Sequence, residues 1–180
     1  NIGDLDGDGV NDLAVGAYED ATGGANRGAV HIMFMNTDGS VDSTVEINSS
    51  TANGPTLANA DKFGRSVANI GDLDGDGVND LAVGATGDNM KANGNEDGAN
   101  RGAVHIIHMN TDGSVKSVVE INDFTTNGPS IGDHDWFGRS VANIGDLDGN
   151  GINDLVVGTN GYDGSGIGTN SGAVHIIFLE

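Results

Sequence analysis

The chain repeats one acidic segment, D-L-D-G-D-G-V-N-D, at Asp4–Asp12 and at Asp72–Asp80, and carries a third copy, D-L-D-G-N-G-I-N-D, at Asp146–Asp154. Each copy has oxygen-bearing side chains at positions 1, 3, 5 and 9 and glycine at position 6. Alternate side chains of so short a loop point inward, and the glycine permits a sharp turn. The spacing therefore predicts three loops that gather oxygen atoms around a common centre.

Such a loop suits a hard cation. Four carboxylates in nine residues repel one another unless a positive charge lies between them. Carboxylate oxygens at alternate positions, with a backbone carbonyl at position 7, are ligands that Ca²⁺ prefers. We expect one Ca²⁺ per loop, and weaker binding in the third loop because Asn150 brings no charge.

Two other interpretations of the loop are weaker. An EF-hand needs a glutamate at position 12 and helices on both sides. Position 12 is occupied by Val15, Val83 and Val157, and the flanking residues resemble strands. A set of polar turns without an ion would not need carboxylates at alternate positions three times.

The acidic loops belong to a longer repeat. The phrase N-I-G-D-L-D-G begins at Asn1, Asn69 and Asn143, so the periods are 68 and 74 residues. The additional six residues fall in the polar run between Ala85 and Gly102, which we expect to be a surface loop. Periods of this size with several short apolar runs indicate stacked or radially arranged units.

Four short strands are expected in the second repeat. The ranges are 63–70, 80–85, 102–109 and 115–121, and the acidic loop joins the first two. The N-T-D-G sequence at 110–113 predicts a hairpin turn, because Asp-Gly suits positive φ angles. No helical period is present, so the predicted fold class is all-β, with units of four antiparallel strands that suggest propeller blades.

Composition limits the possible functions. The net charge is −20 with only 7 Lys and Arg, which argues against nucleic acid and anionic membranes as partners. There is no Cys, so neither disulfides nor thiolate chemistry is available. No run approaches the ~20 apolar residues of a membrane span, and no membrane insertion is expected. The chain shows no signal peptide, starts in the middle of a motif and stops in an apolar run, so we interpret it as a segment of a longer protein.

At these residues the sequence resembles a known family, the FG-GAP repeats of integrin α-subunit β-propellers and of their bacterial relatives. Phe63-Gly64 and Phe137-Gly138 match the first half of the family name. Gly-Ala or Gly-Thr pairs at Gly16, Gly84 and Gly158 match the second half. Three departures are the missing proline after Gly-Ala, Thr159 in the third copy and Asn150 in the third loop.

The resemblance implies Ca²⁺ in the loop between the first two strands of each blade. It transfers the ligand role to the loop side chains and to the backbone carbonyls at position 7. These ligands are Asp4, Asp6, Asp8, Val10 and Asp12; Asp72, Asp74, Asp76, Val78 and Asp80; and Asp146, Asp148, Asn150, Ile152 and Asp154.

Three repeats are too few to close a ring, since propellers have four to eight blades. We expect repeats at 1–62, 63–136 and 137–180, of which the first lacks its opening strand and the last its outer strand. Further blades of a longer chain, or strands lent by other copies, would complete the ring. A solenoid of stacked blades is the lower-ranked alternative.

Other repeated residues favour structural roles. His31, His105 and His175 share one place in G-A-V-H-I and are interpreted as strand residues. The arginines of F-G-R-S and A-N-R-G are expected to pair locally with carboxylates, with ligand contact as the less favoured role. They are Arg27, Arg65, Arg101 and Arg139. The only tryptophan, Trp136, is interpreted as a packing residue rather than a sugar platform.

These patterns favour a non-enzymatic, Ca²⁺-binding module of an extracellular or cell-surface protein. No nucleophile–base set and no phosphate-binding glycine loop is present. The expected role is adhesion, or surface or filament assembly, through contact with other protein chains or further blades. The alternatives are a lectin-like propeller that binds glycans and a non-catalytic accessory domain of a secreted hydrolase.

Overall fold

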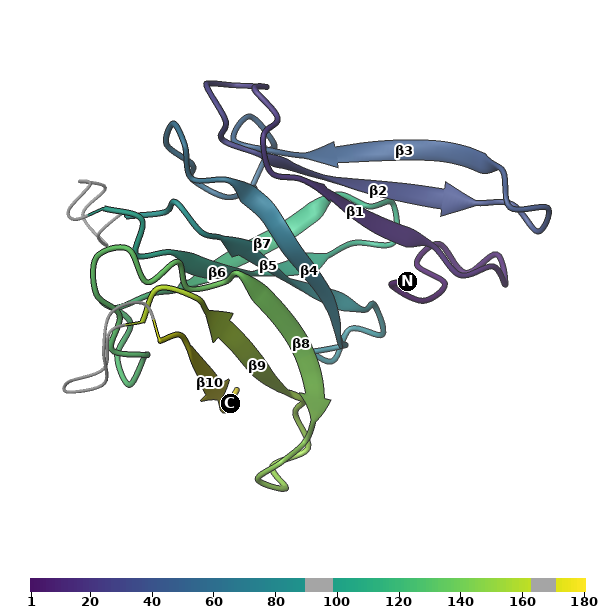
Figure 1. Cartoon of the computed structure of the whole chain (residues 1–180). Coiled ribbons are helices and arrows are strands. Elements are labelled where there is room, and N and C mark those ends of the chain that lie inside the picture. Colours follow the sequence, from purple (N-terminus) through teal and green to yellow (C-terminus); the bar gives the residue numbers. More distant parts are fainter. Residues whose placement is uncertain (90–98, 163–170) are drawn as a thin grey trace.

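Strands and turns account for all the regular structure of this chain in the computed structural model, which describes residues 1–89, 99–162 and 171–180 (Figure 1). The strands form three antiparallel sheets, which we call blades 1, 2 and 3. Blade 1 contains β1 (Leu13–Ala17), β2 (Ala29–Met35) and β3 (Val41–Ile47); blade 2 contains β4 (Phe63–Gly71), β5 (Asp80–Ala85), β6 (Ala103–Met109) and β7 (Val115–Ile121); and blade 3 contains β8 (Ser140–Gly145), β9 (Asp154–Thr159) and β10 (Ala173–Ile177). The described residues include no helix that could cross a membrane.

Blade 2 is a four-stranded meander in the order β4-β5-β6-β7. Its strands agree with the four ranges predicted from the sequence to within one residue. The predicted hairpin turn joins β6 to β7, where the Gly113 N–H donates to the Asn110 carbonyl and Gly113 has a φ of 78°. The predicted all-β fold with antiparallel propeller-like blades is therefore confirmed.

Blades 1 and 3 each have three strands among the described residues, in the orders β1-β2-β3 and β10-β9-β8. The acidic loops show which strands correspond, because each loop precedes β1, β5 or β9. Blade 1 thus holds the second, third and fourth strands of the repeat, and blade 3 the first, second and third. The repeat boundaries at 1–62, 63–136 and 137–180 stay a prediction. The predicted surface loop between Ala85 and Gly102 is only partly visible, because 90–98 lie outside the described residues.

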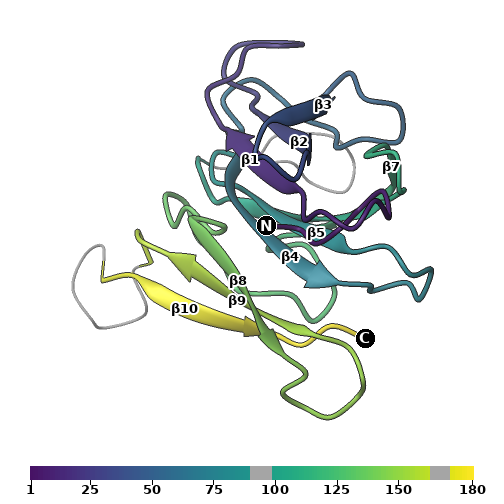
Figure 2. The same cartoon turned by 90° about the vertical axis from the view of Figure 1, so that its right-hand side faces the viewer.

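The blades pack face to face, with β4 in contact with both β1 and β8 (Figure 2). One apolar core lies between blades 1 and 2 around Phe63 and Ile32, and a second lies between blades 2 and 3 around Phe137 and Ile70. All six residues of β5 are buried, because alternate side chains face opposite neighbours. The Phe of each Phe-Gly pair is thus fixed as a central residue of a core between blades.

The glycine of each Gly-Ala pair allows the blades to approach closely. A Cβ atom on Gly16 would lie 1.9 Å from the carbonyl oxygen of Gly64, and one on Gly84 would lie 2.0 Å from that of Gly138. Both contacts join the second strand of one blade to the Phe-Gly pair of the next. A side chain at either position would therefore push two backbones apart.

The three equivalent histidines lie on the third strand of each blade, at the places expected from the sequence. His105 is 1% exposed, and its Nε2 lies 3.2 Å from Oδ2 of Asp88. Its ring packs edge-on against Phe63, with the ring centroids 5.4 Å apart, and His175 packs in the same way against Phe137. The structural interpretation of these residues is therefore supported.

The His105–Asp88 pair makes stability depend on pH. Burial lowers the pKa of His105, but the hydrogen bond to Asp88 and its charge, with the charges of Glu120 and Asp61, together raise it by more, so the net direction is upward. A raised pKa adds stability that is complete below about pH 6.5 and is lost as pH rises through the folded-state value. Each pKa unit of difference corresponds to about 1.4 kcal/mol.

Urea unfolding between about pH 6.5 and 9 is therefore expected to show a falling free energy of unfolding. Burial also raises the pKa of Glu120, and a raised carboxyl pKa lowers stability in the same direction as pH rises, so the comparison with a histidine variant is needed to separate the two groups. His105→Asn should flatten the profile over this range. A wild-type profile that stayed level, or rose, would contradict the assignment.

Candidate metal centres

The three acidic loops lie at corresponding ends of the blades. The second and third loops join β4 to β5 and β8 to β9, and the first precedes β1. Carboxylate oxygens approach one another within 4.8 Å in three sets that contain only aspartates. The sets are Asp4, Asp6 and Asp8; Asp72, Asp74 and Asp76; and Asp146, Asp148 and Asp154.

The aspartate at position 1 organises each loop. In the first loop, Oδ1 of Asp4 accepts hydrogen bonds from the N–H groups of Gly7 (2.8 Å) and Asp8 (3.0 Å), and Oδ2 accepts one from Gly9 (2.9 Å). Asp72 and Asp146 make the same three contacts within 0.1 Å. The N–H groups of Gly151, Gly149 and Asn150 hold the pKa of Asp146 below its ordinary value. The loops are thus three copies of one backbone geometry.

Glycine at position 6 is required by that geometry. Gly9, Gly77 and Gly151 have φ angles of 92°, 89° and 92°, a region that L side chains rarely adopt. In the first two loops the turn brings the side chains at positions 1, 3 and 5 together, and in the third loop those at positions 1, 3 and 9 lie together. The proposed carbonyl ligands of Val10, Val78 and Ile152 stay predictions; their N–H groups donate to the side chain at position 5.

The aspartate at position 9 is buried and serves two segments. In the second loop, Oδ2 of Asp80 accepts from the Leu73 N–H (2.9 Å) and Oδ1 accepts from the Met109 N–H (3.0 Å) at the end of β6. Asp80 is 1% exposed. Asp12 and Asp154 make the corresponding contacts to Met35 and Leu179. Position 9 therefore fastens the loop to the end of the third strand of its own blade, or in blade 3 to the residues just after that strand.

Asparagine at position 8 connects neighbouring loops, a role that sequence reasoning missed. The side-chain N–H₂ of Asn79 donates to the Ile2 carbonyl at 2.9 Å, and that of Asn153 donates to the Ile70 carbonyl at 2.9 Å. Ile2 and Ile70 each stand two residues before an acidic loop. Each of these two loops is thus attached to the backbone just before the preceding loop. The Asn-Asp pair repeated at positions 8 and 9 was the sequence signal that could have indicated this role.

The second loop differs from the others in its surroundings. The ammonium group of Lys116 lies 2.6 Å from Asp74 and 2.7 Å from Asp76, and these contacts raise the pKa of the lysine. His108 Nδ1 lies 3.2 Å from Oδ2 of Asp80. The position of Lys116 in β7 corresponds to Asp42 in β3. Blade 2 therefore supplies its own cation to the loop, whereas blade 1 has a carboxylate at that place.

The third loop has Asn150 at position 5. Its Oδ1 accepts from the Ile152 N–H at 2.7 Å, and its Nδ2 donates to the Leu179 carbonyl at 2.7 Å. The amide thus keeps the turn and adds a contact to the chain after β10. Of the three side chains at position 5, that of Asn150 is the only one without a charge.

The expectation for the arginines is confirmed only in part. Arg101 forms ion pairs with Asp123 (2.6 Å) and Asp133 (2.8 Å). Arg27 hydrogen-bonds to uncharged partners, including Asn59 at 3.1 Å. Arg65 and Arg139 form no ion pair with any residue that the structure describes, so the predicted local pairing is wrong for these two.

Antiparallel blades that repeat along the chain, each with an acidic loop before its second strand, define a repeat protein of the β-propeller class. A family model described as "FG-GAP repeat" matches residues 2–33, 63–107 and 137–177. These ranges make up more than half of the chain. The chain belongs to the FG-GAP repeat family.

Integrin α-subunits are among its relatives. The chain is 33% identical to integrin alpha-4 of Xenopus laevis over 155 residues, and 34% identical to integrin alpha-5 of the same species over 169 residues. It is 31% identical to integrin alpha-PS5 of Drosophila melanogaster over 161 residues. These alignments cover 86% to 89% of this chain but only 13% to 14% of the relatives. The similarity thus concerns a small part of each integrin subunit.

Proposed function

We propose that this chain is a Ca²⁺-stabilised propeller module, with no enzymatic activity, of an extracellular or cell-surface protein. Its role is adhesion or assembly through contacts with other protein chains or further blades. Membership of the FG-GAP family and the integrin α relatives support this class of function. The observation that carries the proposal is the acidic loop, repeated with one hydrogen-bonding pattern in all three blades.

The donor atoms of the loops fit Ca²⁺. They are carboxylate and amide oxygens, with backbone carbonyls available, and each set of three acidic groups lies close enough to share one ion. Among the residues described, Lys116 and His108 at the second loop are the only basic side chains that lie against the acidic loops. Bound Ca²⁺ would remove the repulsion within each loop.

The loops also suggest how an ion would affect the arrangement of the blades. An ordered loop holds Asn79 or Asn153 against the backbone of the preceding blade. The same loop holds Asp80 against the end of the third strand of its own blade, or Asp154 against the residue Leu179 after that strand. Ca²⁺ would thereby stiffen both the blade and the joint with its neighbour, and adhesion would require the ion.

Calorimetric titration of the metal-free chain with Ca²⁺ tests the proposal. We expect saturable binding of three ions per chain. Replacing one position-3 aspartate at a time, with Asp6→Asn, Asp74→Asn or Asp148→Asn, should remove one site each. Absence of saturable Ca²⁺ binding by the folded wild-type chain would disprove the proposal.

The three sites are expected to differ in affinity, with the first loop the tightest. In the second loop Ca²⁺ must displace Lys116 from Asp74 and Asp76, and in the third Asn150 contributes no charge. Lys116→Asp, which reproduces the residue of blade 1, should tighten the second site roughly tenfold, and Asn150→Asp should tighten the third. Titrations of these two variants that matched the wild type at every site would contradict the ranking.

A further inference from the structure

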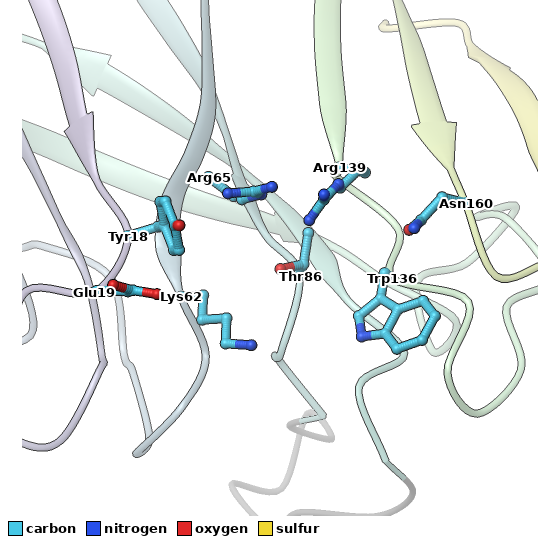
Figure 3. A pocket seen from close by; sticks show the side chains of 8 residues that line it. All are labelled: Tyr18, Glu19, Lys62, Arg65, Thr86, Trp136, Arg139 and Asn160. Carbon is cyan, nitrogen blue, oxygen red and sulfur yellow. The ribbon is translucent and has the colours of Figure 1, made fainter.

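A polar pocket of about 340 Å³ opens where the three blades meet, and it contains none of the acidic-loop residues (Figure 3). Its volume is at the small end of the range for ligand pockets. Blade 1 contributes Tyr18, blade 2 Arg65 and Thr86, and blade 3 Arg139, each from the beginning or end of a strand. The pocket therefore depends on the packing of all three blades.

Positive charge is concentrated in this pocket. Lys62, Arg65 and Arg139 line it, together with one carboxylate, that of Glu19. These are three of only seven basic residues in a chain of net charge −20. Within the described part of the chain, none of the three forms an ion pair. The acidic protein thus gathers three cations without carboxylate partners at one place.

One of the cationic groups, that of Arg65, is held in position by an aromatic ring. The Arg65 guanidinium stacks over the Tyr18 ring, with its carbon 4.4 Å from the ring centroid, and this stacking orients it. Arg65 and Arg139 point toward each other on either side of Thr86 (Figure 3). Thr86 is 2% exposed, and its side chain forms no hydrogen bond to a described residue, so its hydroxyl is available in the pocket. Two guanidinium groups and a hydroxyl thus converge on one small volume.

The pocket is far from the acidic loops. Arg65 lies near the start of β4, and the second loop begins at Asp72 after the end of that strand. About six residues of strand at about 3.3 Å each separate them by roughly 20 Å. This exceeds the Debye length of about 8 Å at physiological ionic strength, so a small anion in the pocket is largely screened from the loops.

We infer that this pocket binds a single carboxylate, supplied by an acidic side chain of a protein partner. Guanidinium groups match carboxylates in shape and form paired, charge-assisted hydrogen bonds. A long polyanion such as a sulfated glycan would extend over the acidic surface and be repelled. A sugar ring would need a free aromatic face, whereas Arg65 stacks over the Tyr18 ring and the other aromatic ring of the pocket, that of Trp136, packs against His134. The inference does not depend on metal in the loops.

Tryptophan fluorescence provides a direct measurement, because Trp136 is the only tryptophan and lines the pocket. The chain is titrated with N-acetyl-Gly-Asp-Gly-amide at a fixed Ca²⁺ concentration and at about 0.15 M salt, the physiological ionic strength. The matched control peptide replaces the aspartate by asparagine. We expect a saturable change in emission with the acidic peptide and none with the control.

Variants assign the binding to the pocket. Arg65→Gln and Arg139→Gln should each weaken binding roughly 10- to 100-fold, the loss expected for a hydrogen bond to a charged group. Arg27→Gln makes the same charge change outside the pocket and should bind like the wild type. Each variant is first shown to keep the wild-type Tm within a few degrees. If one arginine variant is destabilised, the other still tests the inference.

Three results would overturn the inference. These are equal binding of the two peptides, equal binding by the wild type and both arginine variants, and saturable binding of a heparin oligosaccharide without binding of the peptide. Calcium titration of the same samples reports separately on the loops. A negative result for peptide binding in the pocket is therefore distinguishable from a negative result for Ca²⁺ binding in the loops.

Discussion

Gly84→Ala is expected to destabilise the chain by roughly 3 kcal/mol or more, because overpacking of this kind forces the backbone to move. The new Cβ would lie 2.0 Å from the carbonyl oxygen of Gly138 and 2.5 Å from Oγ of Ser66, which donates a hydrogen bond to that carbonyl at 2.8 Å. Blades 2 and 3 would have to separate. For a chain of this size the Tm should fall by roughly 6–12 °C.

Gly158→Ala is the matched control. Gly158 occupies the same motif position in β9, and a Cβ there would lie 2.5 Å from Oγ of Ser140, the residue equivalent to Ser66. No other described residue lies within 4 Å of it, so a rotation of one hydroxyl relieves the contact. The two variants share the clash within the blade and differ in the clash between blades. Equal decreases in Tm would show that the contact between blades contributes nothing and that the glycine is needed only within its own blade.

Local sequence patterns predicted what depends on local geometry. The strands of blade 2, the turn at 110–113 and the clustered side chains at positions 1, 3 and 5 all follow from residues close together in the chain. Alternation of apolar side chains and the positive φ of glycine are properties of short segments. They can therefore be recognised without knowledge of the fold.

Contacts between blades could not be predicted in this way. The partner of Asn79 is the carbonyl of Ile2, 77 residues away, and that of Asn153 is the carbonyl of Ile70, 83 residues away. A repeat period shows that units are alike but not which faces meet. The same limit explains the error over Arg65 and Arg139: their motif repeats with the strands, and only the packing of three blades shows that no described carboxylate reaches them.

Removal of Ca²⁺ is expected to have the other large effect, a decrease in Tm of roughly 15 °C or more. An ion that binds only the folded chain stabilises it by about 2.7 kcal/mol per site at a hundredfold excess over Kd, so three independent sites would give about 8 kcal/mol. Each kcal/mol corresponds to roughly 2–4 °C at this chain length. Thermal unfolding followed by circular dichroism, with excess Ca²⁺ and then with chelator, measures the difference.

The triple variant Asp6→Asn, Asp74→Asn and Asp148→Asn distinguishes the stabilising effect of the ion from that of the loop's own hydrogen bonds. These position-3 side chains are exposed, whereas Asp80 is buried and accepts hydrogen bonds from two backbone N–H groups. The variant should therefore retain the Tm of the chelated wild type, or exceed it because repulsion is relieved, and should not respond to Ca²⁺. If the wild type itself kept its Tm in chelator, the loops would be stable without an ion, and position 9 with the position-8 asparagines would suffice to hold the blades.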